Sequence, residues 1–184
     1  MSEHHVCPWW LAYTFDNPLR RLLHNPKDIF SGYVKEGMTV MDIGCGMGYF
    51  TLGLAEIVGD SGRVIAVDLQ QKMLDIMLKR ATRKGLNNRI APHRSGSNTI
   101  GVETQVDFVL AFWMIHEVPD PDDFFRQIVP ILKPSAKFLY AEPTFHVSDD
   151  KYKEILASAH RVGLKAIQEL SIRFSRAALL TAIK

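Results

Sequence analysis

The residues that most plainly could do chemistry are a glycine-rich loop and an acid that follows it. An apolar run ending in Asp42 leads into Gly44, Gly46 and Gly48, and the next apolar run, Val64 to Val67, ends in Asp68. Glycines let the backbone turn sharply while a ligand approaches without meeting a β-carbon. A carboxylate at the tip of the second strand can accept hydrogen bonds from both hydroxyls of a ribose. The pattern therefore predicts a site for an adenosine-type ligand.

The spacing of the glycines separates two such ligands. A dinucleotide fingerprint, G-x-G-x-x-G, would require glycine at position 49, where the chain has Tyr49, whereas the third glycine here comes one position earlier. This favours S-adenosylmethionine over NAD. Cys45 lies inside the loop, where a nucleophile is conceivable, but a small residue packed beneath the loop is the favoured interpretation.

A second set of reactive side chains follows the fourth and fifth apolar runs. His116 and Glu117 come after Val106 to Phe112, and Glu142 ends the run from Lys137. His116 is a candidate general base, with Glu117 as an orienting group or second acid and Glu142 as a further candidate. The alternative stays open: His116 caps the loop and Glu117 is solvated. Trp113 and Met114, beside Phe112, either line an apolar substrate pocket or pack in the core.

The amino-terminal segment is rich in aromatic residues where chain ends usually fray. We expect Trp9, Trp10 and Tyr13 to form a lid over the site, with core packing as the close alternative. His4, His5 and Cys7 lack a fourth ligand nearby and make a poor zinc site, so no metal is predicted.

The elements that must position these residues follow an alternating pattern. Short β-branched runs alternate with helical patterns from residue 39 onward, which is typical of βαβ units. The expected strands are Thr39 to Ile43, Arg63 to Val67, Arg89 to His93, Val106 to Phe112, Lys137 to Ala141, Leu164 to Ile172 and Arg176 to Ile183. Because the link between the last two is too short for a crossover helix, they predict an antiparallel hairpin.

Helix boundaries are also readable. Gly59 and Gly85 follow two helical patterns, while Asp120 before Pro121 and Ser148 before two acids are expected N-caps. Asn17-Pro18 and Asn25-Pro26 repeat the cap-then-proline pattern, and Pro134 is expected just beyond a helix end.

These motifs together resemble those of class I S-adenosylmethionine-dependent methyltransferases, in the group that includes ubiquinone and menaquinone biosynthesis methyltransferases. The likeness is carried by the glycine loop, Asp68, the stretch from Val106 to Val118, Ile131-Leu-Lys-Pro134 with Glu142-Pro143, and the terminal hairpin. It implies an α/β fold: a Rossmann-like, doubly wound seven-stranded sheet, mainly parallel with an antiparallel last strand, in three αβα layers.

The resemblance also implies roles for individual residues. The loop from Asp42 to Gly48, Cys45 included, would underlie the methionine part of the cofactor, and Asp68 would hold the ribose. Leu69 and Met73 would flank the adenine, and Phe112 would complete the cofactor site. Ser95 and Gly96 stand where the family often has an acid for the adenine amine, so a hydroxyl or the backbone would make that contact. Pro134-Ser135-Ala136 replaces the usual Pro-Gly-Gly and is expected to alter a surface turn.

Bulk properties bound the remaining possibilities. The chain has 184 residues, 47% of them hydrophobic, and a net charge of +2, which offers no strong field for polyanions and does not favour a nucleic-acid partner. Two separated cysteines and the lack of a signal peptide or membrane span predict a cytoplasmic protein. We expect one compact domain, with residues 1–34 as a helical lid segment and 35–184 as the cofactor-binding domain, in a monomer or homodimer.

The expected activity is methyl transfer by in-line displacement to a small-molecule acceptor. Neither the family's signature for amino methylation nor the Pro-Cys of cytosine methylation follows the fourth strand. Two alternatives remain: a catalytically silent cofactor-binding regulatory or scaffold protein and, less favoured, a nicotinamide-dependent oxidoreductase.

Overall fold

The computed structural model describes residues 23–183, and its elements alternate between strands and helices. In chain order they are α3 (Pro26–Phe30), β1 (Thr39–Ile43), α4 (Tyr49–Val58), β2 (Arg63–Asp68), α5 (Gln71–Arg83), η1 (Asn87–Arg89), β3 (Ile90–Arg94), β4 (Val106–Phe112), η2 (Ile115–Glu117), α6 (Pro121–Ile128), η3 (Val129–Ile131), β5 (Leu132–Pro143), α7 (Asp149–Arg161), β6 (Leu164–Ile172) and β7 (Ser175–Ala182).

Within these residues the strands form one seven-stranded sheet in the order β3-β2-β1-β4-β5-β7-β6. The five strands from β3 to β5 pair in parallel, and β7 pairs antiparallel with both β5 and β6. The predicted hairpin is therefore confirmed, and its last strand inserts into the sheet beside β5. The strand order reverses between β1 and β4, which is where open α/β sheets bind ligands.

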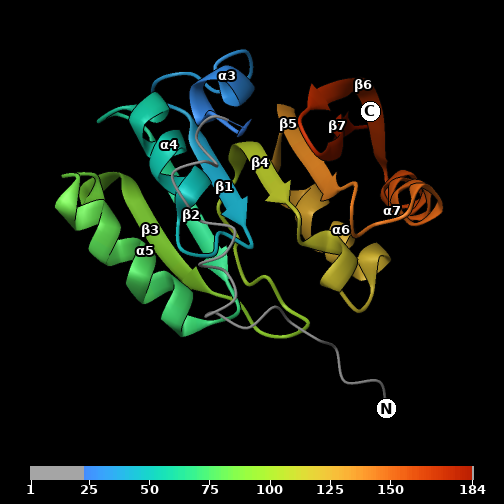
Figure 1. The fold of residues 1–184 in the computed structure, drawn as a ribbon, viewed down its shortest axis with the longest axis horizontal. Coiled ribbons are helices and arrows are strands. Elements are labelled where there is room, and N and C mark those ends of the chain that lie inside the picture. The colour runs from blue at the N-terminus through green and yellow to red at the C-terminus, as the bar shows by residue number, and fades with distance from the viewer. Residues whose placement is uncertain (1–22, 184) are drawn as a thin grey trace.

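Alternate residues of each central strand face two separate cores. Val40 of β1 belongs to a core cluster with residues of α3, α4 and α5, whereas its neighbour Met41 belongs to a cluster with residues of α6 and α7. Figure 1 shows α4 and α5 on one side of the sheet and α6 and α7 on the other. Each fully buried side chain of this size contributes about 1.5–3 kcal/mol. The three-layer αβα architecture expected from the sequence is confirmed.

The helix starts follow the expected capping chemistry. The side chain of Asn25 accepts from the backbone N–H of Lys27 at α3, and Ser148 accepts from that of Lys151 at α7. At α6, Asp120 accepts from the N–H of Asp123. Each bond satisfies one amide that the first turn of a helix leaves without a partner.

Pro134 lies beyond the helix end, as expected, but the stretch Pro134-Ser135-Ala136, which was expected in a surface turn, lies within β5. This strand is longer than expected, and its pairing with β4 shifts register: Val106 faces Leu132, while Phe108 faces Lys137. Residues 133–136 form the irregularity, with Pro134 and Ser135 exposed. Because a bulged residue donates no ladder hydrogen bond, proline is tolerated there. α6 ends earlier, at Ile128, and continues as η3.

The expected helix at Asn25-Pro26 is present as α3, while the one at Asn17-Pro18 lies outside the described residues. The boundary of the predicted lid segment therefore stays a prediction. Across residues 23–183, no helix has the length and apolar character needed to cross a bilayer.

Candidate functional site

The glycine loop joins β1 to α4 in a backbone conformation that only glycine adopts readily. Gly44, Gly46 and Gly48 have φ angles of 69°, 53° and 84°. A β-carbon on Gly48 would lie 2.3 Å from Cγ of Met77, so this glycine lets α4 start against α5. Around Gly46, by contrast, no atom of residues 23–183 other than its chain neighbours lies within 4 Å of the added β-carbon. Gly46 thus leaves open space for a ligand.

Asp68, at the end of β2, fastens this loop to the neighbouring strand. Its Oδ2 accepts from the N–H of Gly46 at 2.9 Å, and its Oδ1 accepts from the N–H of Gln70 at 2.9 Å. Burial raises the pKa of the Asp68 carboxyl, and the hydrogen bonds from the backbone oppose that effect. A carboxylate has about four acceptor positions, so Asp68 can also accept from a ligand hydroxyl.

Asp42 and Cys45 are held beneath the loop. Asp42 is buried, and its Oδ2 accepts from Oγ1 of Thr51 at 2.6 Å. Burial, and after it the negative charges of Asp42 and Asp68, raise the pKa of the Cys45 thiol well above its usual range. A thiol in that environment stays protonated and is a poor nucleophile. The geometry therefore supports a packing role for Cys45.

A pocket of about 1060 Å³ opens above the loop. Its wall includes most of the residues assigned to the cofactor from sequence, namely Asp42, Gly44, Cys45, Gly46, Asp68, Leu69, Met73, Ser95, Gly96 and Phe112. Gly48 does not line it and packs against Met77 instead. The volume lies at the upper end of the roughly 300–1,000 Å³ usual for a ligand pocket, which leaves room for a cofactor and a second small molecule.

The far end of the pocket carries His116 and Glu117, both on η2. Glu142, near the end of β5, does not line the pocket but lies behind His116, with its side chain 1% exposed. One carboxylate oxygen of Glu142 accepts from the backbone N–H of His116 at 3.0 Å, and the other lies 2.6 Å from Nδ1 of the ring. The structure thus brings together the three candidates for acid–base chemistry.

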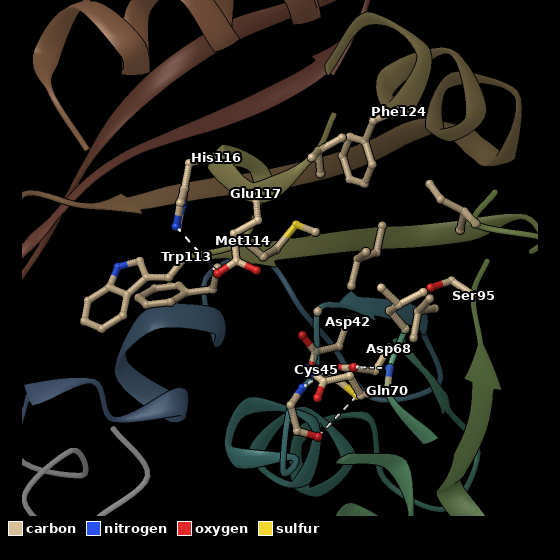
Figure 2. A pocket seen from close by; sticks show the side chains of 18 of the residues that line it. Asp42, Cys45, Asp68, Gln70, Ser95, Trp113, Met114, His116, Glu117 and Phe124 are labelled. Atoms are coloured by element: carbon tan, nitrogen blue, oxygen red, sulfur yellow. Dashed lines mark hydrogen bonds and ion pairs between the residues drawn. The ribbon is translucent and has the colours of Figure 1, made fainter. Parts of the chain in front are cut away.

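The charge environment of His116 favours its protonated form. Burial lowers the pKa of the imidazole, but the hydrogen bond with Glu142 and the charges of Glu142 and Glu117 outweigh burial and raise it overall. The Nε2 atom lies 3.9 Å from Oε1 of Glu117. Figure 2 shows His116, Glu117, Met114 and Trp113 at one end of the pocket and Asp42, Cys45 and Asp68 at the other.

Some residues that shape the site were not predicted from the sequence. The ring centroids of His146 and His116 lie 5.0 Å apart, and both residues line the pocket, although no partner for His146 was visible in the sequence. Phe145 also lines the pocket, and Thr51 anchors Asp42. The one signal in the sequence is that Phe145 and His146 closely follow Glu142-Pro143, at the carboxyl end of a strand.

Other predicted residues fall in the amino-terminal segment. Trp9, Trp10 and Tyr13, assigned to a lid, lie outside the described residues, as do His4, His5 and Cys7.

Comparison with known proteins supplies the family. A family model described as a methyltransferase domain matches residues 34–170, about three quarters of the chain. The chain belongs to this family. The expected resemblance to class I methyltransferases, and the cofactor that it implies, S-adenosylmethionine, are confirmed at the level of the family.

Individual proteins that resemble the chain share about a third of its residues over part of its length. A demethylmenaquinone methyltransferase of Lactobacillus johnsonii is 35% identical over 105 residues, 56% of this chain and 43% of that protein. One from Staphylococcus saprophyticus is 31% identical over 123 residues, 65% of this chain and 52% of that protein. A protein-L-isoaspartate O-methyltransferase of Methanococcoides burtonii is 31% identical over 88 residues, 48% of this chain and 43% of that protein. The chain spans about half the length of these relatives.

Among solved structures, an S-adenosylmethionine-dependent methyltransferase from Aquifex aeolicus superposes with a TM-score of 0.87 at 22% identity, covering 97% of this chain and all of that one. This likeness supports the fold of the described residues.

Proposed function

We propose that this methyltransferase domain transfers a methyl group from S-adenosylmethionine to a small-molecule acceptor whose nucleophilic atom carries a proton. The observation that carries the proposal is His116, which is held by Glu142 and lines the same pocket as the glycine loop and Asp68. A positioned base at one end and a ribose-binding carboxylate at the other are the two groups that such a transfer requires.

The residues of the pocket fit the cofactor. The open space at Gly46 suits the methionine part, Asp68 has acceptor capacity left for the ribose hydroxyls, and Leu69 and Met73 offer apolar faces for the adenine. Ser95 and Gly96 lie on the same wall and would face the adenine amine through a hydroxyl or the backbone. When bound, S-adenosylmethionine supplies an electrophilic methyl group on a sulfonium that leaves with the bonding electron pair.

His116 is placed to take the proton of the acceptor. With Nδ1 donating its hydrogen to Glu142, the neutral ring presents Nε2 as the proton acceptor. The new bond to the methyl carbon uses the electron pair of the acceptor atom, and its proton moves to Nε2. The charges of Glu142 and Glu117 then stabilise the imidazolium that forms. Glu142 acts as a positioning residue, because it does not reach the pocket.

A small molecule is the favoured acceptor class. The pocket combines a few polar groups with apolar side chains, among them Trp113, Met114 and Phe124. Several relatives are called demethylmenaquinone methyltransferases, a name that refers to a small lipophilic compound. Identity near 30% over part of each protein supports this class without selecting a compound.

The test is methyl transfer from labelled S-adenosylmethionine into fractionated cell extract. We expect label in a small-molecule fraction, and we expect His116→Asn to slow its incorporation by about 10²–10⁴-fold, the usual contribution of a general base. Binding of S-adenosylhomocysteine, measured by calorimetry, should change little in this variant. His160→Asn is the matched control, because His160 is an exposed histidine on α7.

The outcomes separate the alternatives. Binding of S-adenosylhomocysteine without transfer to any fraction would favour a catalytically silent protein. Full activity in His116→Asn would remove the base from the mechanism while leaving the cofactor assignment intact. Lack of binding at millimolar S-adenosylhomocysteine would sink the proposed function itself.

A further inference from the structure

The backbone of Trp113 is held in an unusual conformation at the pocket. Its φ angle is 61°, in the left-handed region that bulky residues rarely adopt. Its N–H donates to the carbonyl oxygen of Ala141 on β5 at 2.8 Å, and its indole Nε1–H donates to Oγ of Ser175 at 2.9 Å. Two hydrogen bonds to different strands therefore fix both the backbone and the ring of this pocket residue.

The turn between β6 and β7, residues Arg173 and Phe174, together with Ser175 at the start of β7, supplies more than one of these anchors. The carbonyl oxygen of Phe174 accepts from the backbone N–H of Thr144 at 2.9 Å and from its Oγ1 at 3.2 Å. Thr144 precedes Phe145, which lines the pocket. The hairpin turn is thus bonded to both segments that carry aromatic rings at this end of the site.

These two rings adjoin at right angles at the pocket. The rings of Trp113 and Phe145 meet edge to face, with centroids 5.4 Å apart, and Phe145 is 64% exposed. An aromatic side chain that lines a pocket and stays exposed offers apolar area for a ligand to cover. Since His116 lines the same pocket, a ligand ring packed against Trp113 and Phe145 would lie in the cavity that contains the proposed base, His116.

We propose that a flat, uncharged ring of the acceptor packs in the corner between Trp113 and Phe145, and that Ser175 is the positioning residue that holds the Trp113 indole in place. The inference rests on the proposed function, because it concerns the acceptor end of that site. It assigns the choice of acceptor to the carboxyl-terminal hairpin, away from the glycine loop.

The test measures ring binding to protein saturated with S-adenosylhomocysteine. The probes are 2-naphthol and its saturated analogue decahydro-2-naphthol, which share a hydroxyl and a carbon skeleton but differ in flatness. We expect calorimetry to give at least tenfold tighter binding of 2-naphthol. Ser175→Ala should weaken 2-naphthol binding about fivefold and leave S-adenosylhomocysteine binding within twofold, because the indole loses its anchor. Ser175→Thr, which keeps the hydroxyl, should restore 2-naphthol binding.

Two further variants keep the result interpretable. Phe145→Leu, at an exposed position, should weaken 2-naphthol binding without affecting the fold. Ser171→Ala, at an exposed serine of β6, should change nothing and serves as the matched control. Equal binding of the two probes by the wild-type protein, or unchanged 2-naphthol binding in both Ser175→Ala and Phe145→Leu, overturns the inference. Failure to bind S-adenosylhomocysteine at all overturns the proposed function instead.

Discussion

Glu142 lies outside the pocket but is bonded to His116, which lines it. It is almost completely buried, and His116 binds it through both the backbone N–H and the ring. Removing one partner of a buried charged pair leaves the other without compensation, which is more costly than losing an exposed pair. The orientation, tautomer and pKa of His116 therefore depend on a side chain of β5.

The raised pKa of His116 predicts a pH dependence of stability. A histidine whose pKa is higher in the folded protein than in the unfolded chain adds stability that is fully present below the unfolded value, about 6.5, and is lost as the pH rises through the folded value. We expect the difference in unfolding free energy between wild type and His116→Asn to shrink between about pH 6 and pH 9. Urea denaturation of both proteins at pH 6 and pH 9 measures this difference in unfolding free energy.

In a Glu142→Gln background, the effect of His116→Asn on the unfolding free energy should depend less on pH, since this change removes the charge that raises the pKa of His116. In the wild-type protein the stability contribution of His116 falls as the pH rises, whereas the rate of methyl transfer should increase, because the neutral imidazole is the base. A wild-type difference that stays constant across this range would contradict the assignment.

Asp68 carries a separate prediction about cofactor affinity. Asp68→Ala removes the proposed acceptor for the ribose hydroxyls and the anchor for Gly46. Hydrogen bonds to charged groups contribute about 1.5–3 kcal/mol, so S-adenosylhomocysteine should bind roughly 10- to 150-fold more weakly by calorimetry. Asp75→Ala is the control, because Asp75 lies exposed on α5 and accepts from Gln71. Equal affinity in both variants would remove Asp68 from the site.

At the scale of elements, the start of α4 depends on the absence of a side chain at Gly48. Both Gly48 and Gly85 have positive φ angles, of 84° and 68°, but only at Gly48 would a β-carbon meet Met77. Gly85→Ala should cost about 1–2 kcal/mol from backbone strain alone. Gly48→Ala should cost about 1–3 kcal/mol more, because α5 must shift to relieve the overlap.

Chemical denaturation of the two variants tests this difference. Equal destabilisation would mean that Met77 moves aside freely. A larger loss for Gly48→Ala, together with weaker binding of S-adenosylhomocysteine, would tie the contact between α4 and α5 to the shape of the loop.

For the molecule as a whole, ligand-induced stabilisation distinguishes the cofactors. A ligand that binds only the folded state at about one hundred times its dissociation constant adds about 2.7 kcal/mol, which for a chain of this size raises Tm by roughly 5–10 °C. We expect this shift with S-adenosylhomocysteine and none with NAD, measured by differential scanning fluorimetry. A shift with NAD alone would instead support the nicotinamide alternative.

The sequence by itself determined the features that short-range rules govern. Glycine spacing, the caps Ser148 and Asp120, and the alternation of apolar residues in β1 and β4 are local properties, so they predicted the elements and the cofactor end of the pocket. The length of β5 was missed because its bulge compensates for Pro134, and that compensation depends on pairing with β4.

Only the tertiary structure decided which distant side chains meet. His116 and Glu142 are 26 residues apart, and Trp113 and Ser175 are 62 apart, yet each pair is joined by hydrogen bonds. The sequence placed His116 and Glu142 at the ends of neighbouring strands but left open whether they touched, because contact depends on register and side-chain rotamers. Nothing in the sequence indicated the contact of Ser175 with Trp113, because it depends on the antiparallel insertion of β7 beside β5.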